Sequence, residues 1–513
     1  MNGAESLVHT LLDGGVDVCF TNPGTSEMHF VSALDRIDGM RCVLGLFEGV
    51  VTGAADGYAR MTGKPAATLL HLGPGLANGN ANLHNAGRAR TPVVNIVGDH
   101  TSYHRQHDAP LTSDVEGTAR PFSKWVRTSR DANAVSRDGA DAIVAARSPT
   151  AGVATLILPA DTAWGEAVGP TEVPPPPARA IVDDKVITLA AEALRGPGPK
   201  LLFLGNAALL GDGLKYAARI AEATGAHLLA ETFNPRFERG AGRLAVERLQ
   251  YSISHALDTL GELSTIVLAG AKVPVAFFAH PGKPSVLLPQ SCEVATLATP
   301  DEDIVQALAA LADLIGARTD RKVEALEPPA LPHGAITLPG LAAVIGALIP
   351  DQGIVVDESV TSGRGLFPAT RNSRPHDWLQ NVGGSIGFGM PAATGAAIAC
   401  PDRKVLCLEA DGCGMFTLQS LWSQAREGLD ITTVIFANRE YAILKQELAN
   451  VGVPSPGPKA LDLLNIGRPD LDWVGLARSM GVEAGRATTL EELADQLGRG
   501  LATPGPYLVE LVM

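Results

Sequence analysis

Two oxygen-bearing side chains stand after successive predicted strands near the C-terminus. Asp411 follows the apolar run 405–408, Asn438 follows the β-branched run 431–436, and a helical segment separates the runs. A strand–helix–strand unit makes its strands parallel, so both side chains are expected at one carboxyl edge, where ligands bind. Hard oxygen ligands suit Mg²⁺ or Ca²⁺ and leave room for a bound diphosphate. The alternative is a structural turn aspartate and a strand-end asparagine.

The spacing of this unit resembles a known signature. An Asp-Gly pair with an asparagine 27 positions after the aspartate is similar to the diphosphate and Mg²⁺ signature of thiamine diphosphate enzymes in the acetolactate synthase and benzoylformate decarboxylase group. That signature usually begins with glycine, where this chain has Ala410. The resemblance covers most of the 513 residues. At this edge it implies cofactor contacts from Asp411, Gly412, Cys413, Asn438 and Tyr441, and metal ligation by Asp411, Asn438 and the backbone carbonyl of Glu440.

The carboxylate of Glu48 is the predicted activator of that cofactor. Glu48 follows the apolar run 41–47 and precedes a helix of small residues. Such a glutamate is often only a solvated residue at a helix start, because the helix dipole favours acid there. By resemblance, Glu48 bonds to the aminopyrimidine ring, favours its imino tautomer and so lets the cofactor act as its own base.

Two turns in the same segment are candidate ligand loops. The loop 21–27, which contains Pro23, Gly24 and Thr25, lies at a strand's carboxyl end, a ligand position in an open sheet. Thr25 can equally serve as a helix cap. His71 ends a strand and enters a Gly/Pro turn; a histidine there is commonly structural.

The resemblance gives this second turn a role. Benzoylformate decarboxylase carries histidine at the place of His71, where it relays protons, and Asn78 matches an asparagine that contacts the cofactor. Acetolactate synthases usually have a hydroxyl residue at the position of His71.

In the last segment, a hydroxyl-rich turn and a glycine-rich loop are candidate cofactor contacts. Thr361 and Ser362 can donate hydrogen bonds to a diphosphate. The loop 381–391 places a bulky aliphatic residue among glycines, which fits close backbone approach or simply tight packing. By resemblance, the Gly384 carbonyl receives the cofactor's amino group and Ile386 bends the cofactor into a V.

Other stretches give weaker or negative indications. His280 lies where benzoylformate decarboxylase contributes a second active-site histidine, although an exposed loop is the alternative. The histidines His100, His104 and His107 indicate a substrate loop or a plain surface loop rather than a metal site. Acetolactate synthases place Phe-Gln after the following Asp-Ala, where this chain reads Pro110-Leu111. No dinucleotide-binding glycine motif follows a strand in the middle segment, so FAD is not predicted.

Composition limits the class of protein. The net charge of −14 argues against nucleic acid or anionic membranes as partners. Six cysteines form no C-x-x-C pair and fit a reducing cytoplasm. The N-terminus reads as a first helix rather than a signal peptide, and no apolar run is long enough to span a membrane.

Proline-rich breaks at 169–179 and 325–340 divide the chain. Repeated strand–helix signals predict three α/β domains, each a doubly wound parallel sheet. The predicted limits are 1–168 for an N-terminal pyrimidine-binding domain, 181–325 for a central domain and 340–513 for a C-terminal diphosphate- and Mg²⁺-binding domain. Residues 444–464 contain turn residues without a strong period and are a predicted lid.

The resemblance implies an enzyme that uses thiamine diphosphate and Mg²⁺ to decarboxylate or ligate a 2-oxo acid through an enamine. Because Glu48 and Asp411 lie in different domains, and this family takes them from different subunits, a homodimer is the minimum and a homotetramer is expected. Two alternatives stay open. One is an acetolactate synthase catalytic subunit, and the other is a silent homologue that acts as a binding partner.

Overall fold

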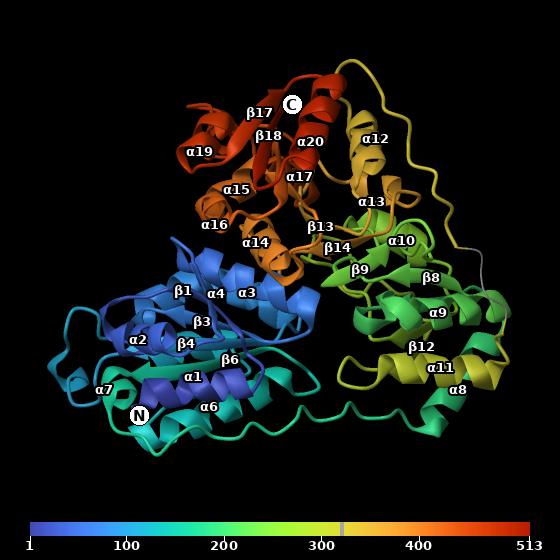
Figure 1. Ribbon diagram of the computed structural model, residues 1–513. Coiled ribbons are helices and arrows are strands. Elements are labelled where there is room, and N and C mark those ends of the chain that lie inside the picture. Colours follow the sequence, from blue (N-terminus) through green and yellow to red (C-terminus); the bar gives the residue numbers. More distant parts are fainter. Residues whose placement is uncertain (319–322) are drawn as a thin grey trace.

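The computed structural model describes residues 1–318 and 323–513, and Figure 1 shows three α/β bodies, coloured blue, green and orange to red. Residues 319–322, near the end of the predicted central domain, lie outside the described residues. The sheets of the three bodies contain six, five and seven strands. The prediction of three α/β domains built on parallel sheets is confirmed.

The N-terminal sheet is parallel, in the order β2-β1-β3-β4-β6-β5. The strands β3, β4 and β6 are buried along their whole length, as expected where helices cover both faces. Its strands are β1 (Val18–Asn22), β2 (Arg41–Leu44), β3 (Ala66–Leu70), β4 (Val93–Asp99), β5 (Trp125–Thr128) and β6 (Val153–Pro159). Its helices are α1 (Gly3–Asp13), η1 (Thr25–Glu27), α2 (Met28–Arg36), α3 (Glu48–Thr62), α4 (Leu72–Arg88), η2 (Arg105–His107), α5 (Val115–Ala119), η3 (Arg120–Phe122), α6 (Ala132–Arg147) and α7 (Ala160–Trp164).

The middle sheet is also parallel, in the order β10-β8-β7-β11-β12. Its strands are β7 (Lys200–Leu204), β8 (His227–Ala230), β10 (Glu247–Arg248), β11 (Thr265–Ala269) and β12 (Glu293–Ala298). Its helices are α8 (Asp184–Arg195), η4 (Asn206–Leu209), α9 (Gly211–Thr224), α10 (Ile253–Leu260) and α11 (Ile304–Ile315).

The C-terminal sheet has the order β17-β18-β16-β15-β13-β14-β9. Its strands are β13 (Gly353–Glu358), β14 (His376–Gln380), β15 (Val405–Ala410), β16 (Ile431–Ala437), β17 (Glu483–Ala487), β18 (Tyr507–Val512) and β9 (Arg236–Arg239). Its helices are α12 (Leu338–Leu348), α13 (Leu366–Ala369), α14 (Gly389–Ala399), α15 (Asp411–Thr417), α16 (Ser420–Glu427), α17 (Ala442–Asn450), α18 (Pro458–Asp462), α19 (Trp473–Ser479) and α20 (Leu490–Ala502).

One strand departs from the expected all-parallel pattern. The strand β9 comes from the middle stretch of the chain but pairs antiparallel with β14 at the edge of the C-terminal sheet. An antiparallel edge strand is common on sheets that are otherwise parallel. In this pairing Phe237 faces Trp378, and Phe237 also packs edge-on against Phe367 at 5.0 Å between ring centroids. The middle stretch is therefore fastened to the C-terminal sheet by backbone pairing as well as by side chains.

A buried guanidinium joins all three parts of the chain. Arg60, on α3, forms an ion pair with Asp56 at 2.6 Å and donates to the carbonyls of Gln380 at 2.5 Å and Pro235 at 3.3 Å. The acceptors lie at the end of β14 and just before β9, so one side chain satisfies backbone groups of two other bodies.

Two helices from different sheets cross at unusually short range. A Cβ built on Gly57 of α3 would lie 2.1 Å from the carbonyl oxygen of Ala392 on α14, and one built on Gly395 would lie 1.9 Å from that of Ala54. Only glycine permits this approach. The small-residue helix after Glu48 is therefore an interface helix between the N-terminal and C-terminal bodies.

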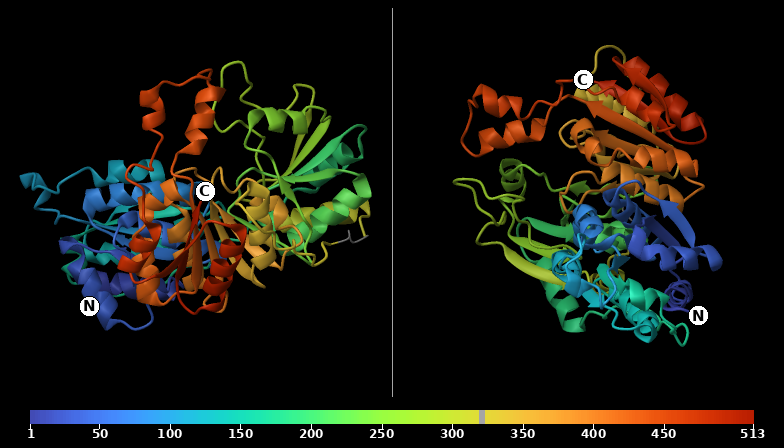
Figure 2. Two further views of the ribbon diagram at one scale, coloured as in Figure 1. Left: turned by 90° about the horizontal axis from the view of Figure 1, so that it is seen from above. Right: turned by 90° about the vertical axis from the view of Figure 1, so that its left-hand side faces the viewer.

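Two predicted turns are helical in the structure. The segment after His71 was expected to be a Gly/Pro turn, yet α4 begins at Leu72 and includes Pro74 in its first turn. Proline is tolerated there because its missing N–H would have had no partner within the helix. The predicted lid contains α17 and α18, which stand out from the C-terminal sheet beside a green loop of the middle stretch (Figure 2).

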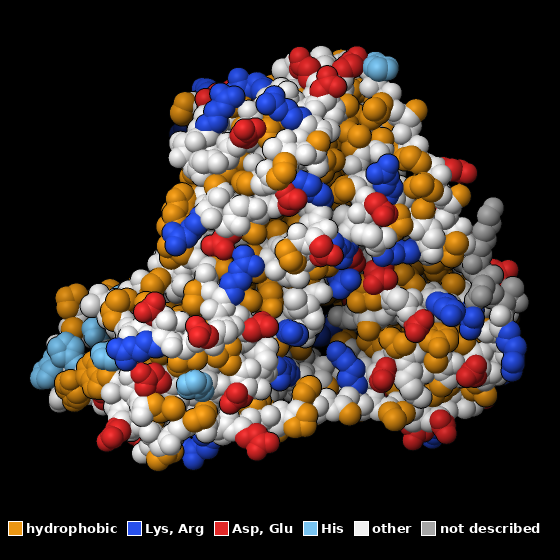
Figure 3. Space-filling view, in the orientation of Figure 1, with side chains coloured by type: hydrophobic (Ala, Val, Ile, Leu, Met, Phe, Trp, Pro, Cys, Tyr) orange, Lys and Arg blue, Asp and Glu red, His pale blue; other side chains and the backbone are white. Residues whose placement is uncertain are grey.

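The surface has a few further features. Figure 3 shows histidine side chains gathered at the left-hand end of the molecule, and His104 lies 5.5 Å and 5.6 Å from His100 and His107 between ring centroids. Among the described residues, no helix combines the length and apolar character that crossing a membrane requires.

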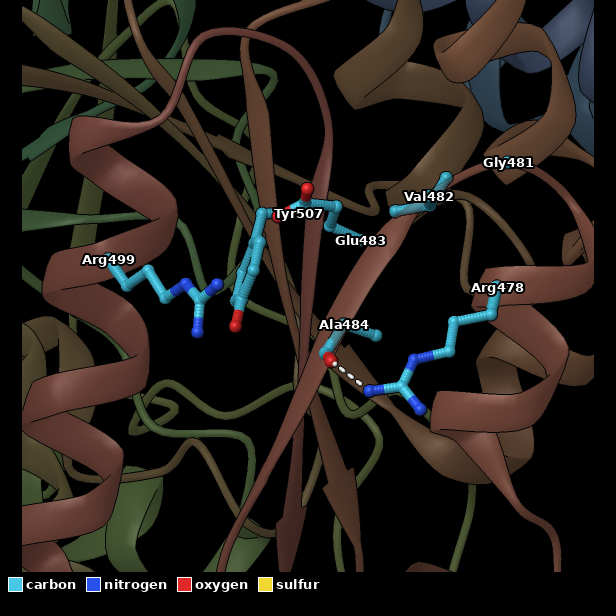
Figure 4. A pocket seen from close by; sticks show the side chains of 7 residues that line it. All are labelled: Arg478, Gly481, Val482, Glu483, Ala484, Arg499 and Tyr507. Carbon is cyan, nitrogen blue, oxygen red and sulfur yellow. Dashed lines mark hydrogen bonds between the residues drawn. The ribbon is translucent and has the colours of Figure 1, made fainter.

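A cavity of about 430 Å³ lies at the amino ends of β17 and β18 (Figure 4). Its Arg478 donates to the Ala484 carbonyl at 3.1 Å, and its Arg499 lies 6.0 Å from the ring of Tyr507. Because Asp411 and Asn438 follow the carboxyl ends of their strands, this cavity is at the opposite edge of the sheet from them.

Candidate active site

The predicted site residues gather at two topological switch points. In the N-terminal sheet, β1 has β2 on one side and β3 on the other, and the loops after β1 and β3 carry residues 22–27 and His71. In the C-terminal sheet, β13 lies between β14 and β15, and the loops after β13 and β15 carry Thr361 and Asp411. The crevice at a switch point is the usual ligand position in open α/β sheets.

Glu48 begins α3, so its expected position at a helix start and its candidate catalytic role are compatible. The Nδ2 of Asn78, on α4, donates to Glu48 Oε2 at 3.0 Å. A Cβ on Gly75 would lie 3.1 Å from Glu48 Oε1. The structure thus brings Glu48 and Asn78 together, with the carboxylate half-buried against the first turns of α4.

His71 is bound by a carboxylate that sequence reasoning did not assign to the site. Its Nδ1 lies 2.8 Å from Glu27 Oε2 and 3.3 Å from Ser26 Oγ. Glu27 is only 2% exposed, and it also accepts the Gly24 N–H at 2.6 Å and the Ser26 hydroxyl at 2.5 Å. A carboxylate on Nδ1 selects the tautomer in which Nε2 is the free acceptor.

The signal for Glu27 was present in the sequence as the end of the polar loop 21–27. The sequence did not indicate the role of Glu27, because His71 and Gly98, which lie against its carboxylate, come from other strands. A Cβ on Gly24 would lie 2.2 Å from the His71 ring, and one on Gly98, in β4, would lie 1.7 Å from Glu27 Oε1. Both glycines make room for the Glu27–His71 pair.

The predicted metal ligands lie beside one another at the carboxyl edges of β15 and β16. Asp411 is 2% exposed, and its oxygens accept the N–H groups of Gly412 at 2.8 Å and Arg439 at 2.6 Å. Burial raises the pKa of Asp411 to about 6, although the two backbone N–H groups oppose the shift. None of the ion pairs among the described residues involves Asp411. A divalent cation would supply the missing positive charge.

The other residues of this edge surround Asp411. The Oδ1 of Asn438 accepts the Glu440 N–H at 3.1 Å, and the Glu440 side chain pairs with Lys445. A Cβ on Gly412 would lie 2.5 Å from the ring of Tyr441. Cys413 is buried, and burial raises the pKa of its thiol well above the usual value, so it is an unreactive neutral group.

Backbone strain marks the same loops. Of the seven non-glycine residues with positive φ in the described ranges, three adjoin predicted site residues: Leu72 after His71, Val360 before Thr361, and Arg439 after Asn438. A β-branched residue such as Val360, at φ 50°, is a clear outlier. Strain of this kind concentrates where a ligand or a catalytic geometry requires it.

The glycine-rich loop, residues 381–389, presents free acceptors. The carbonyl of Gly384 and both backbone groups of Ile386 have no hydrogen-bond partner within the described part of the chain. A loop of the middle stretch reaches the same place, because a Cβ on Gly384 would lie 2.6 Å from Phe277 Cζ. The roles expected for the Gly384 carbonyl and the Ile386 side chain stay predictions.

Two buried glutamates near this loop had no assigned role. Glu358 and Glu409 end neighbouring strands, and together with the Cys413 thiol they offer ligand atoms within 4.8 Å of one another. Burial raises the pKa of both carboxyl groups, and that of Glu409 most strongly, with the negative charge of Glu358 as the second cause. Four N–H donors favour the charged form of Glu358, so the proton belongs on Glu409.

His280 is paired with the lid. Its Nε2 lies 2.9 Å from Glu447 Oε2 on α17, and Arg364 donates to Gln446 Oε1 at 2.6 Å. His280 is thus beside the Phe277 loop and α17, and none of the contacts among the described residues joins it to His71. In the part of the chain that the structure describes, no hydrogen bond, ion pair or ring contact joins the His100, His104 and His107 loop to Glu48 or His71.

Within one chain, the predicted site residues form two separate groups. One contains Glu48, His71 and Asn78, to which the structure adds Glu27, and the other contains Asp411, Asn438, Tyr441 and the glycine-rich loop. No hydrogen bond or ion pair between described side chains links Glu48 or His71 to Asp411 or Asn438. Each group is a half-site with its own chemistry.

The residues present fit a thiamine diphosphate and a divalent metal. Asp411 and Asn438 provide the oxygen donors, the Gly384 carbonyl is a free acceptor, and Ile386 stands between glycines. In the other half-site, Glu48 is a carboxylate that a ring nitrogen could approach.

Comparisons with known proteins support the thiamine diphosphate part of this assignment. The family model described as the N-terminal TPP binding domain of thiamine pyrophosphate enzymes matches residues 1–117, and the model for their C-terminal TPP binding domain matches residues 363–511.

Full-length relatives extend the match. The chain is 55% identical over 515 residues to a Mycobacterium tuberculosis protein provisionally named acetolactate synthase large subunit IlvX, covering 100% of this chain and 99% of that protein. It is 30% identical over 539 residues to benzoylformate decarboxylase of Pseudomonas aeruginosa, covering 97% and 96%. The structure of thiamine diphosphate-dependent 4-hydroxybenzoylformate decarboxylase from Rhodococcus jostii RHA1 is similar with a TM-score of 0.86 at 25% identity, covering 99% and 98%.

Proposed function

Because the chain belongs to the thiamine pyrophosphate enzymes, we propose that it uses thiamine diphosphate and Mg²⁺ to act on a 2-oxo acid. The proposed reaction is non-oxidative decarboxylation, carboligation or both. The observation that carries this proposal is the pairing of two half-sites at switch points, one with Glu48 and His71 and the other with Asp411 and Asn438.

Each half-site has a distinct task in this proposal. Asp411, Asn438 and the Glu440 carbonyl would hold Mg²⁺, while Thr361, Ser362 and the amides of Gly412 and Cys413 would bind the diphosphate. Residues Pro23, Gly24 and Thr25 line the pyrimidine side. When bound, the thiazolium accepts the electron pair that carbon dioxide leaves behind.

The acid–base work falls to the N-terminal half-site. Glu48 holds a proton at the pyrimidine nitrogen N1′, with Asn78 fixing the carboxylate at 3.0 Å. Glu27 orients His71 so that its Nε2 faces away from the carboxylate and can exchange a proton with the reacting carbon. His280, 2.9 Å from Glu447, is the second candidate proton carrier, and α17 excludes water above it.

We further propose that the complete site forms between two copies of the chain. No hydrogen bond or ion pair between described side chains joins Glu48 or His71 to Asp411 or Asn438, so each half-site lacks the groups of the other. A homodimer is thus the smallest active unit, and a homotetramer is the expected assembly. We also propose a cytoplasmic location, because the pattern of cysteines fits a reducing compartment.

The substrate class has two candidates. His71 and the overall similarity to benzoylformate decarboxylases favour simple decarboxylation of a 2-oxo acid. The 55% identity to the M. tuberculosis relative favours 2-acetolactate synthesis from pyruvate. The Pro110-Leu111 pair argues against this reaction, because acetolactate synthases are expected to have Phe-Gln there.

A panel of aliphatic and aromatic 2-oxo acids tests the proposal. Carbon dioxide release and the products should be measured with thiamine diphosphate and Mg²⁺, using Glu48→Gln and Asp411→Asn as matched variants. We expect Glu48→Gln to bind the cofactor but lose activity, and Asp411→Asn to lose Mg²⁺-dependent binding. Equal activity in Glu48→Gln and the parent would remove Glu48 from the mechanism, and binding without turnover of any substrate would favour the silent homologue.

A further inference from the structure

Glu358 ends β13 beside the C-terminal switch point and is 4% exposed. Its Oε2 accepts three successive backbone N–H groups, from Gly387 at 3.1 Å, Phe388 at 2.7 Å and Gly389 at 2.8 Å. These are the last residues of the glycine-rich loop and the start of α14. One carboxylate oxygen thus fixes the end of the loop that follows Ile386.

The other carboxylate oxygen of Glu358 holds the beginning of the glycine-rich loop through the side-chain amide of Asn381. Glu358 Oε1 accepts the Nδ2 of Asn381 at 2.9 Å. Asn381 also donates to the Ser385 carbonyl at 2.6 Å and accepts the Gly384 N–H at 2.8 Å. A single buried carboxylate therefore reaches both ends of the loop.

The opposite side of the loop is held by α4. Asn85 exchanges hydrogen bonds with the Ser385 N–H at 3.1 Å and carbonyl at 2.8 Å, and Asn82 donates to the Gly387 carbonyl at 3.0 Å. Among the described residues, the Gly384 carbonyl and the backbone groups of Ile386, which are expected to face the cofactor, have no hydrogen-bond partner. The polar contacts surround the loop and hold it in one conformation.

The charge of Glu358 suits this task. Hydrogen bonds to an ionised acceptor are shorter and about twice as strong as neutral ones. The three N–H groups open α14, where the helix dipole favours a negative charge. A neutral side chain of the same size would keep the packing but weaken every one of these bonds.

We propose that Glu358 is a positioning residue that holds the glycine-rich loop so that the Gly384 carbonyl and the Ile386 side chain keep the cofactor bent. This inference rests on the proposed function. The Glu358 carboxylate touches neither substrate nor cofactor in this account; it acts through Asn381 and the loop backbone.

The test compares Glu358→Gln with Glu510→Gln, a matched control. Glu510 is also a buried strand glutamate of the same sheet, 2% exposed, and accepts Arg486 at 2.9 Å and 3.1 Å. Amide hydrogen exchange of the peptide spanning residues 381–389, measured without cofactor, should rise roughly tenfold or more in Glu358→Gln only. Exchange of the C2 proton of added thiamine diphosphate should fall about a hundredfold, the cost of an ångström-scale misplacement.

The outcomes are separable. Parental protection of residues 381–389 in Glu358→Gln overturns the proposal, and so does an exposed loop with a parental C2 exchange rate. If Glu358→Gln is insoluble, Asn381→Ser is judged by the same two measurements. If the parent itself neither binds thiamine diphosphate nor exchanges its C2 proton, the proposed function fails, whereas the loop measurement still reports on Glu358.

Discussion

Among single residues, the carboxylates that organise the site are the buried ones. Glu27 binds His71, the backbone of Gly24 and the hydroxyl of Ser26, so it fixes three groups of one half-site. These three contacts accompany the burial of Glu27, which is 2% exposed. A glutamate that is buried and fully bonded is costly to replace, because each of its partners would lose an acceptor.

The Glu27–His71 pair should behave as one catalytic unit. We expect Glu27→Gln and His71→Gln each to lower kcat by roughly a hundredfold, the usual range for a positioned acid–base group. The double variant should lose little more than either single one, because residues that act together are not additive. Steady-state kinetics of all three variants checks this; losses that multiply would show independent roles.

The buried histidine His376 should give the fold a pH dependence. His376 is fully buried, and its Nδ1 donates to the Arg374 carbonyl at 2.7 Å. Its pKa is lowered to about 4, chiefly by burial and also by the charges of Arg239 and Arg243, while the bond to the Arg374 carbonyl and the charge of Asp377 oppose the shift. The unfolded state, with a pKa near 6.5, therefore binds more protons between these values, so stability should fall as pH drops from about 6.5 to about 4.

This contribution amounts to up to about 3 kcal/mol across that window. Denaturant unfolding as a function of pH should show a flatter slope in His376→Gln than in the parent. The exposed His333, whose ring is 80% accessible, provides the control His333→Gln with a parental slope. Equal slopes in all three proteins would contradict the assignment of His376 as the titrating group.

Among the elements, helices α3 and α14 cross so closely that only small side chains fit between them. The helix that begins with Glu48 packs directly on the helix that begins after the glycine-rich loop, so the two half-sites have a common mechanical support. Small residues let the two helix axes approach closely, and the dispersion contacts between the helix backbones compensate for the contacts that larger side chains would make.

We expect Gly57→Ala to destabilise the protein by about 1–3 kcal/mol, because the new methyl group would lie 2.1 Å from the Ala392 carbonyl oxygen. The control is Gly498→Ala on α20, where an added Cβ meets nothing within 4 Å. That change should stabilise by about 0.5–1 kcal/mol through helix propensity. Thermal unfolding measures both, and a neutral Gly57→Ala would contradict the tight crossing.

In the whole molecule, the parts of the site are distributed over sheets that the chain connects in three places. Arg60, β9 and the α3–α14 crossing fix the bodies to one another. The half-sites nevertheless remain separate within the chain. This arrangement favours a symmetric pair in which the same two surfaces meet twice.

Mixing two inactive variants tests the location of the complete site. Purified mixed dimers of co-expressed Glu48→Gln and Asp411→Asn chains should recover about half of the parental activity, because each mixed dimer has one intact site of two. Each variant alone should be inactive. The measurement is 2-oxo acid turnover by purified mixed oligomers carrying two affinity tags, and no recovery would place the site within one chain.

The sequence alone determined the three-body α/β class, the strand ends that carry Asp411 and Asn438, and the helix that begins at Glu48. These features follow from local apolar patterns and from the rule that ligands bind at the carboxyl edges of parallel strands. Residues that are near one another in the sequence are therefore enough to predict them. The resemblance to thiamine diphosphate enzymes rested on the same local spacing, and the family match bears it out.

Only the tertiary structure decided which groups meet across strands. Glu27 reaches His71 from another loop, β9 crosses into the C-terminal sheet, and Glu358 meets three amides about thirty residues away. Such pairs depend on strand order and register, which the local pattern of a strand does not specify. The physical reason is that burial and hydrogen bonding are satisfied over the whole fold, so a buried carboxylate acquires its role from partners that the sequence places far away.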